Sequence, residues 1–375
     1  MMNRKWLRLS AAVLIVFMMM MLYMTPKAEP EFGVQASAMA LIEYETGEMI
    51  AKENCDTPLP MASTTKIMTA LVVLESCDID EYCDIPDEAV GVEGSSIYLQ
   101  KGERMKVRDL LYGLMLSSGN DAAVALAVHV GGSVEGFADM MNERAKRLGL
   151  TKTHFVTPNG LSAEGHYTTA YELCLTAREA MQNAAFREIV SSKYYTAESG
   201  EKVRTFKNKN SLLWNYEGAL GIKTGYTMAA GRCLVFSAER NGMTVIGAVL
   251  NCRPMFETAE KLMDYAFLNY CVETVVAKGT QVKKINIENS VESILEVETK
   301  GSIIALMQRG EERSFRTEVK LYGLSAPIEK GETVGKLLVY DGEKLIGETE
   351  LAASYSIHVK DFGFWLKLIA SVFAS

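Results

Sequence analysis

The sequence predicts an α+β fold, in which an antiparallel sheet is flanked by helices and joined to a helical subdomain, followed by a small all-β domain. Three observations predict it. Apolar and polar residues alternate near residue 40 and again between residues 220 and 250, a pattern typical of strands. Long apolar runs typical of buried helices occupy much of the sequence between these strands. From about residue 275 onward, short strand-like runs recur with few long helical runs between them.

The composition is that of a globular protein long enough for two domains. The chain has 375 residues, of which 48% are hydrophobic and 23% are charged, and its formal net charge is −8. An acidic balance gives no support to nucleic-acid binding, so we do not expect nucleic acid as a partner.

The N-terminal segment has the pattern of an export signal. Arg4, Lys5 and Arg8 precede an apolar run from Leu9 to Met24, and Pro26 then ends any helix. A basic stretch followed by an apolar stretch is typical of exported proteins. The run is long for a signal core and short for a membrane span, so residues 1–33 are interpreted as a signal peptide or an uncleaved N-terminal anchor.

Residues 34–272 form the first predicted domain. A hairpin is expected over residues 38–51 with its turn at 45–47, and Asn241 with Gly242 is a strong signal for a second hairpin. The other expected strand covers 220–227, and the second hairpin joins strands 233–238 and 243–250. Helices are expected over residues 63–74, 110–115, 122–128, 170–185 and 256–270.

Residues 275–355 form a second predicted domain, which is small, all β and without an evident catalytic constellation. Alternation predicts strands over 282–287, 294–299, 303–307, 317–321, 336–340 and 345–351, with a hairpin turn at Asp341 and Gly342.

A C-terminal amphipathic helix is expected within residues 360–375. One helical face carries Phe362, Trp365, Leu366, Ile369, Val372 and Phe373. At about 1.5 Å per residue the helix is too short to span a bilayer. We therefore expect it to lie in the membrane interface, and docking on the β domain is the alternative.

Ser63 and Lys66 are the first candidate catalytic pair. They are three residues apart, so their side chains can meet on one face of a helical turn. The residues after Lys66 are almost wholly apolar, which predicts a buried lysine with no carboxylate near it in sequence. Burial favours the neutral amine, and a neutral amine beside a hydroxyl is a base beside a nucleophile. The lysine pKa must fall from near 10.4 by roughly three to four units, which argues for a second cation nearby.

A Ser-x-x-Lys pattern alone is a weak signal, because a second one, Ser199 to Lys202, lies in a polar stretch typical of an exposed turn.

The segment Ser117 to Asn120 adds a polar corner between two apolar helices. There Ser118 can pass on a proton and the Asn120 amide can position a peptide. A helix-capping loop is the structural alternative, since serine and asparagine are preferred caps.

Lys223 is the expected second cation, on an inward-facing position of the strand 220–227. Gly225 marks a place where another backbone can approach closely. A solvated lysine at a strand edge is the structural alternative, but it explains neither Thr224 nor Gly225.

Cysteine and histidine give no framework for a metal or for disulfides. The seven cysteines form an odd set without a Cys-x-x-Cys pair, and they are interpreted mostly as small buried residues. Cys77 and Cys83 are the only plausible local pair. The four histidines have no metal-ligand spacing, so no metal and no cofactor are expected.

The three segments form an ordered set, Ser63 to Lys66, Ser118 to Asn120 and Lys223 to Gly225. This set resembles that of penicillin-binding proteins and related β-lactamases, with glycine in place of aspartate in the second motif. With its flanking residues it closely resembles the low-molecular-mass D-alanyl-D-alanine carboxypeptidases over roughly residues 36–270. The resemblance implies a β-lactamase/transpeptidase-like catalytic domain in residues 34–272.

The same resemblance implies a serine-type peptidase that removes the terminal D-alanine from peptidoglycan pentapeptides through an acyl-enzyme. It implies covalent inhibition by β-lactam antibiotics and a location at the outer face of the cytoplasmic membrane or in the cell wall. Ser63 would be the nucleophile, Lys66 its base and Ser118 a proton relay. The implied substrate-binding residues are Asn120, Lys223, Thr224, Gly225 and Thr227, and the oxyanion hole would be formed by the backbone N–H groups of Ser63 and Tyr226.

Three other functions remain open at this point. A β-lactamase is disfavoured because no Glu-x-x-Leu-Asn pattern lies between Ser118 and Lys223 and because the β domain is foreign to those enzymes. An endopeptidase acting on D-alanyl cross-links would use the same residues. An inactive wall-binding protein would not need a buried lysine.

Two departures from the family are Tyr226, where many relatives carry histidine, and Lys367 as the single cation of the tail helix.

Overall fold

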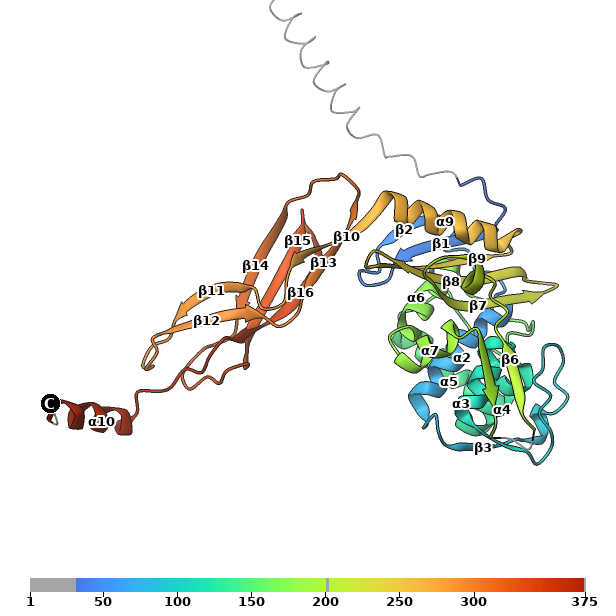
Figure 1. Cartoon of the computed structure of the whole chain (residues 1–375), viewed down its shortest axis with the longest axis horizontal. Coiled ribbons are helices and arrows are strands. Elements are labelled where there is room, and N and C mark those ends of the chain that lie inside the picture. Colours follow the sequence, from blue (N-terminus) through green and yellow to red (C-terminus); the bar gives the residue numbers. More distant parts are fainter. Residues whose placement is uncertain (1–31, 200–201, 374–375) are drawn as a thin grey trace, which may run out of the picture. The chain divides into compact units, whose positions relative to one another are not determined.

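The computed structural model describes residues 32–199 and 202–373 of the chain (Figure 1). The predicted signal peptide or anchor lies outside the described residues, apart from its last two positions. Within the described part of the chain, no helix combines the length and the apolar composition that crossing a membrane requires.

A five-stranded antiparallel sheet forms the centre of the first domain, in the order β2–β1–β9–β8–β7. Its strands are β1 (Ala38–Glu43), β2 (Met49–Glu53), β7 (Ala219–Thr227), β8 (Gly231–Arg240) and β9 (Met243–Leu250). Both predicted hairpins are confirmed. Asn241 and Gly242 have φ angles of 52° and 77°, which suit the tight turn between β8 and β9. Strand β7 lies at one edge of the sheet.

Helices cover both faces of this sheet (Figure 1). On one face α9 (Met255–Asn269) packs against β8 and β9, and on the other α6 (Ala170–Ala180) packs against β1 and β9. The prediction of a single helix over residues 170–185 is wrong. The helix ends at Ala180, and Asn183 caps a second helix, α7 (Ala184–Ser191), by accepting the N–H groups of Ala185 and Phe186.

The helical subdomain surrounds α2 (Lys66–Ser76), which follows a 3-10 turn, η1 (Ala62–Thr65). All residues from Lys66 to Val73 are buried, as the apolar composition predicted. The helices packed around α2 are α3 (Val107–Leu116), α4 (Asn120–Gly131), α5 (Val134–Arg147), α6 and α7.

Several short elements complete the first domain and were not predicted. They are the ribbon of β3 (Tyr82–Asp84) with β4 (Arg104–Lys106), the ribbon of β5 (Tyr194–Ala197) with β6 (Arg204–Lys207), and the short helices η2 (Asp87–Ala89) and α8 (Leu212–Asn215). Segments of three or four residues carry too little alternation to be recognised in a sequence.

The second domain is all β, which confirms the predicted class. A five-stranded antiparallel sheet has the order β11–β12–β16–β15–β14, and β10 pairs with β13. The sequence did not predict β10. The strands are β10 (Tyr270–Val276), β11 (Gln281–Asn286), β12 (Ile294–Thr299), β13 (Ile303–Gln308), β14 (Phe315–Leu321), β15 (Thr333–Asp341) and β16 (Lys344–Ala353).

The predicted C-terminal helix is present as α10 (Phe362–Phe373). Several of its apolar side chains are exposed, namely Phe362, Trp365, Leu366, Leu368 and Ile369. The helix therefore presents an uncovered apolar surface.

The cysteines are all free, and Cys77 and Cys83 form no disulfide. Five of the seven are buried, which agrees with their interpretation as small core residues. Only Cys77 and Cys271 are partly exposed.

Candidate active site

Ser63 lies in η1, the 3-10 turn before α2, and not in the first turn of an α-helix as the sequence predicted. Lys66 is the first residue of α2, and its Nζ lies 3.0 Å from Ser63 Oγ. Ala62, directly before Ser63, has a φ angle of 49°, a left-handed conformation that is uncommon outside glycine. Backbone strain of this kind persists only where the surrounding structure enforces it, and it is concentrated at functional sites.

Two glycines allow other backbone segments to pack against this turn. A Cβ atom on Gly160 would lie 2.0 Å from the carbonyl oxygen of Ala62. A Cβ atom on Gly225 would lie 3.0 Å from the backbone nitrogen of Ser63 and 3.1 Å from the carbonyl oxygen of Met61. The close backbone approach expected at Gly225 is therefore confirmed, and β7 runs directly beside the serine turn.

A buried chain of hydrogen bonds, from His166 through Thr65 to Ala62, also holds the strained turn. His166 Nδ1 accepts the N–H of Val156 at 3.0 Å, so Nε2 carries the ring proton and donates to Thr65 Oγ1 at 2.8 Å. The Thr65 hydroxyl in turn donates to the carbonyl oxygen of Ala62 at 2.8 Å. Burial lowers the pKa of His166 to about 4, which keeps the ring neutral and this arrangement intact at neutral pH.

The Lys66 amine has three oxygen neighbours, and none of them is acidic. Nζ lies 3.0 Å from Ser63 Oγ, 2.7 Å from Asn120 Oδ1 and 2.5 Å from the carbonyl oxygen of Asn159. A neutral amine has two N–H donors and one lone pair. The two carbonyl-type oxygens can accept both N–H groups, which leaves the lone pair to receive the hydroxyl proton of Ser63. The geometry therefore suits a general base.

The surroundings of Lys66 favour its neutral form. Burial holds its pKa well below the usual range, and the ammonium groups of Lys223 and Lys209 lower it further, against a small opposing effect of Asp121. Burial also lowers the pKa of Lys223 to about 7, with a contribution from Lys209. Lys66 is 0% exposed and Lys223 is 2% exposed, so water does not screen the interaction between the two amines.

The second motif lies at the start of α4. Ser118 has a φ angle of 63°, and the N-cap of the helix is Gly119, which has no side chain to cap it. The capping alternative is therefore wrong for Ser118 and Asn120. The Asn120 side chain is satisfied on both sides, because Oδ1 accepts from Lys66 and Nδ2 donates to the carbonyl oxygen of Glu93 at 2.6 Å.

Gly119 is enclosed by neighbouring side chains. A Cβ atom there would lie 2.9 Å from Asp121 Oδ1 and 3.1 Å from Ile97 Cγ2. Asp121 is itself fixed, since it accepts the N–H groups of Ile97 and Leu99 and the hydroxyl of Ser96. The structure thus explains why the second motif carries glycine in this chain.

A cleft of about 330 Å³ opens beside Ser63 and joins the three motifs. It is lined by Ser63, Ser95, Ser118, Lys209, Thr224, Gly225, Tyr226, Arg232, Met255 and Phe256. Lys66, Asn120 and Lys223 are buried and do not line it. Thr227 also lies outside the lining, and its Oγ1 accepts the N–H of Ala230 at 3.0 Å.

Several residues of this site were missed in the sequence. Asn159 contributes a backbone carbonyl, so its side-chain type carries no signal. Lys209 stands in a polar stretch, and only the fold brings it to the cleft, where its Nζ donates to Ser95 Oγ at 3.0 Å. His166 has no neighbour in sequence that would reveal its contact with Thr65.

A five-stranded antiparallel sheet and a helical subdomain that meet at a serine–lysine pair are typical of penicillin-binding proteins and related β-lactamases. The family model for D-alanyl-D-alanine carboxypeptidase matches residues 24–253, and the model for the C-terminal domain of penicillin-binding protein 5 matches residues 270–358. The chain belongs to the D-alanyl-D-alanine carboxypeptidase family.

Individual relatives agree over most of the chain. The D-alanyl-D-alanine carboxypeptidase DacF of Bacillus subtilis is 33% identical over 352 residues, which cover 91% of this chain and 90% of that protein. The crystal structure of penicillin-binding protein 5 from Haemophilus influenzae covers 89% of this chain and 100% of its own, with 26% identity and a TM-score of 0.72. The Streptomyces K15 DD-transpeptidase covers 64% of this chain and 100% of its own, with 38% identity and a TM-score of 0.60.

We predict that Lys223→Met stabilises the protein at pH 7. The native pKa of about 7 lies below that of an unfolded lysine, so the unfolded state binds more protons between pH 7 and about 10.4, and wild-type stability rises with pH across this range. Methionine removes the buried amine, which should raise the free energy of unfolding at pH 7 by on the order of a few kcal/mol and flatten its rise with pH. Thermal unfolding at several pH values measures both effects.

The matched control is Lys202→Met, which changes an exposed lysine and should alter neither quantity. A Lys223→Met protein that is less stable than wild type at pH 7 would show that the Lys223 amine makes a net favourable contribution.

Proposed function

We propose that this protein is a serine-type D-alanyl-D-alanine carboxypeptidase that removes the terminal D-alanine from peptidoglycan pentapeptides through an acyl-enzyme on Ser63. The observation that carries the proposal is the buried Lys66 amine, 3.0 Å from Ser63 Oγ and without an acidic partner among its hydrogen bonds. Family membership supports the reaction class.

Acylation begins when Ser63 Oγ attacks the carbonyl carbon between the last two D-alanines. The hydroxyl proton moves to the lone pair of Lys66 Nζ, and the carbonyl becomes a tetrahedral oxyanion. The backbone N–H groups of Ser63 and Tyr226 stabilise that charge, with roughly 3 to 4 kcal/mol lost when one such donor is removed from comparable sites. The close approach of β7 to the serine turn, measured at Gly225, supports this assignment.

Collapse of the intermediate breaks the peptide C–N bond and leaves an ester on Ser63. The departing D-alanine nitrogen takes a proton, which Ser118 passes on from Lys66, and Ser118 lines the same cleft as Ser63. Water then attacks the ester carbonyl and gives one proton to Lys66. As the bond to Ser63 Oγ breaks, Lys66 returns that proton to Oγ, which restores the Ser63 hydroxyl and releases the shortened peptide.

The cleft also suits the anionic end of the substrate. Lys209 and Arg232 line it together with Thr224, and no acidic side chain is among its described lining residues. Lys223 lies behind Thr224, with Nζ 3.0 Å from the Thr224 carbonyl oxygen. We assign binding of the terminal carboxylate of the substrate to Thr224, assisted by the positive electrostatic field of these cations. Gly225 has no side chain and allows the substrate to approach β7. Thr227, the other residue expected to bind substrate, makes a contact within the β7–β8 turn, where its Oγ1 accepts the N–H of Ala230.

Asn120 is assigned a positioning role in addition to the peptide contact that its motif implies. Both ends of its amide are occupied, and Oδ1 orients the Lys66 amine at 2.7 Å. A substrate peptide that contacts Asn120 must therefore share these hydrogen bonds or replace the one to Glu93.

The substrate class implies action outside the cytoplasm, where peptidoglycan lies. We propose that β-lactam antibiotics acylate Ser63 as analogues of the terminal dipeptide. We also propose that the protein is held at the outer face of the membrane by α10 or by the N-terminal segment. The exposed side chains of Phe362, Trp365 and Leu366 support the role of α10.

The first test is release of D-alanine from a diacyl-L-Lys-D-Ala-D-Ala peptide by the detergent-solubilised full chain. Wild type should release D-alanine and become acylated by a labelled penicillin, and Ser63→Ala should do neither, since the attacking oxygen is missing. Ser199→Ala, in the second Ser-x-x-Lys pattern, is the control. It removes hydrogen bonds to Asp109 and Lys106 but no lining residue of the cleft, so the folded variant should retain both activities. Labelling of Ser63→Ala would refute the assigned nucleophile. Absence of release with intact labelling would favour the endopeptidase function, which cross-linked muropeptides would then test.

The pH dependence of acylation should respond to Lys209. The reaction requires neutral Lys66, so the rate rises as pH passes upward through the pKa of Lys66. Lys209→Gln removes a cation that lowers this pKa, so the acidic limb of the profile should move to higher pH. The measurement is the rate of acylation by a fluorescent penicillin from pH 5 to 10, with Lys202→Gln as control. If Lys209→Gln weakens the affinity for the penicillin but leaves the acidic limb of the pH profile unmoved, Lys209 only binds ligand and does not act on the pKa of Lys66.

Membrane association should depend on α10 once the N-terminal segment is removed. A variant lacking residues 1–33 should sediment with lipid vesicles, because the exposed apolar face of α10 can insert into the interface. A variant that also lacks residues 361–375 should remain in the supernatant. Equal sedimentation of the two proteins would assign the membrane contact to another part of the chain.

A further inference from the structure

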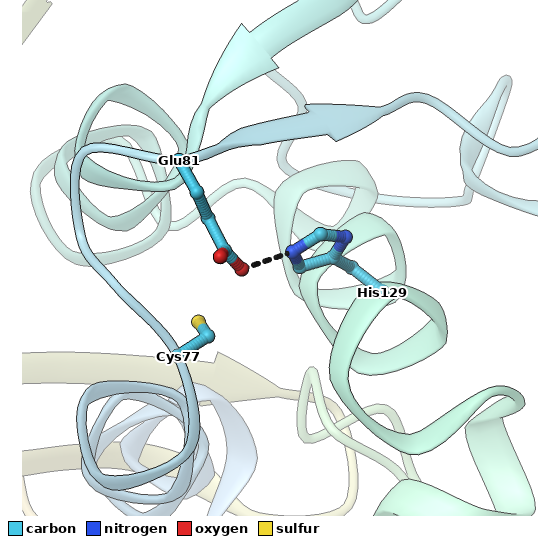
Figure 2. Close-up of side chains that lie close together, drawn as sticks. All are labelled: Cys77, Glu81 and His129. Atoms are coloured by element: carbon cyan, nitrogen blue, oxygen red, sulfur yellow. Dashed lines mark hydrogen bonds and ion pairs between the residues drawn. The ribbon is translucent and has the colours of Figure 1, made fainter.

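Three metal-ligating side chains meet far from the cleft, at the opposite ends of two active-site helices (Figure 2). Cys77 follows the last residue of α2, Glu81 precedes β3, and His129 lies in the last turn of α4. The Cys77 sulfur, a Glu81 carboxylate oxygen and a His129 ring nitrogen all lie within 4.8 Å of one another. Figure 2 shows the three side chains directed toward a common point.

We propose that Cys77, Glu81 and His129 bind one zinc ion, with a water molecule as the fourth ligand. Thiolate, imidazole and carboxylate are the three protein ligand types that zinc accepts in tetrahedral sites. A thiolate and a carboxylate carry two negative charges, which balance the charge of the ion. Hard cations such as Mg²⁺ and Ca²⁺ prefer oxygen ligands only, so the sulfur favours zinc over them.

The distances can contract to those of a zinc site. With metal–ligand bonds of about 2.0 to 2.3 Å, tetrahedral ligands lie roughly 3.3 to 3.6 Å apart. His129 Nε2 and Glu81 Oε1 are now joined by a hydrogen bond of 2.8 Å. Zinc would replace that hydrogen bond and move the two atoms slightly apart, and the imidazole would carry its proton on Nδ1 instead, by exchange with the solvent. Cys77 would release its thiol proton to the solvent as the Zn–S bond forms. The required shifts of about 1 Å are within reach of side-chain rotation.

The site is accessible, and its backbone is held. The His129 side chain is 24% exposed and that of Glu81 is 42% exposed, so an ion and a water ligand can enter. The N–H of Cys77 donates to Val73 O at 3.2 Å, and the N–H of Glu81 donates to Asp78 O at 3.1 Å. The ligands therefore need to reorganise only their side chains.

A zinc ion here would join the two helices that supply the active-site lysine and asparagine. Lys66 begins α2 and Asn120 begins α4, whereas Cys77 and His129 stand at the far ends of these helices. Cys77 lies 11 residues after Lys66 and His129 lies nine residues after Asn120, so at 1.5 Å per residue the metal would be about 14 to 17 Å from the catalytic groups. We therefore assign the ion a structural role, which goes beyond the proposed function and does not depend on it.

The sequence could not reveal this cluster, and it predicted no metal. The sequence separation of 48 hides the proximity of the Glu81 and His129 side chains, which is created when α4 packs beside α2 and β3. None of the recognised zinc spacings is present.

The test uses the detergent-solubilised full chain, reduced and freed of metal, with Co²⁺ as a spectroscopic probe and Zn²⁺ as competitor. Wild type should bind one Co²⁺ with a sulfur-to-cobalt charge-transfer band, and one equivalent of Zn²⁺ should abolish the band. Cys77→Ser should lack the band. The matched control is Cys271→Ser, because Cys271 is the other partly exposed cysteine, and this variant should retain the band.

His129→Gln and Glu81→Gln provide a second line of evidence that does not require changing the cysteine. Each can keep a hydrogen bond between positions 81 and 129, yet each should weaken zinc binding by about ten-fold or more. Zinc at one hundred times the wild-type dissociation constant should raise the melting temperature of wild type by on the order of 3 °C, and that of these variants by about half as much or less. Circular dichroism and penicillin labelling verify that every variant is folded.

Two results would overturn the proposal. One is the absence of stoichiometric Co²⁺ or Zn²⁺ binding by reduced wild type. The other is a charge-transfer band that persists in Cys77→Ser or disappears in Cys271→Ser, since the sulfur ligand would then be a different cysteine.

Discussion

The burial of the Lys66 amine without an acidic partner is the interaction on which the rest of the site depends. A carboxylate beside the amine would stabilise the ammonium form and oppose the general-base role proposed for Lys66. The chain instead offers neutral oxygens from Asn120 and Asn159, and it places other lysines nearby. The apolar α2, the strained Ala62 and the glycines that admit neighbouring segments all serve this arrangement. Stability is given up locally in exchange for an amine whose pKa lies well below its usual range.

The three motifs were visible in the sequence because each is a short local pattern whose chemistry depends on side-chain type. Ser63 with Lys66, and Lys223 with Gly225, could be interpreted before any fold was known. The carbonyl of Asn159 could not be, since any residue has one. Lys209 could not be identified either, because only the fold places a lysine from that polar stretch beside the cleft. The roles of groups that act through the backbone or through a field are set by tertiary structure.

The elements of the fold also divide into those that a local sequence pattern predicts and those that only tertiary structure determines. Hairpins with their own turn signals, such as β8 and β9 around Asn241 and Gly242, were predicted with their correct partners. The strand β10 was missed because its partner β13 lies more than 25 residues away and its own apolar residues continue those of α9. The break between α6 and α7 was missed because Asn183 acts as a cap only once Ala185 and Phe186 turn back toward it. Local propensity alone does not separate these cases.

Gly119 determines how the second motif can change during evolution. Any side chain at this position meets Asp121 and Ile97, and an aspartate would add a second carboxylate beside the first. Asp121 cannot simply move away, because it holds the backbone of Ile97 and Leu99. The Ser-Gly-Asn and Ser-Asp-Asn versions of the motif are therefore separated by coordinated changes in two neighbouring segments. In this chain a change of Gly119 alone to aspartate is therefore expected to disturb the start of α4, so packing constrains the position as much as chemistry does.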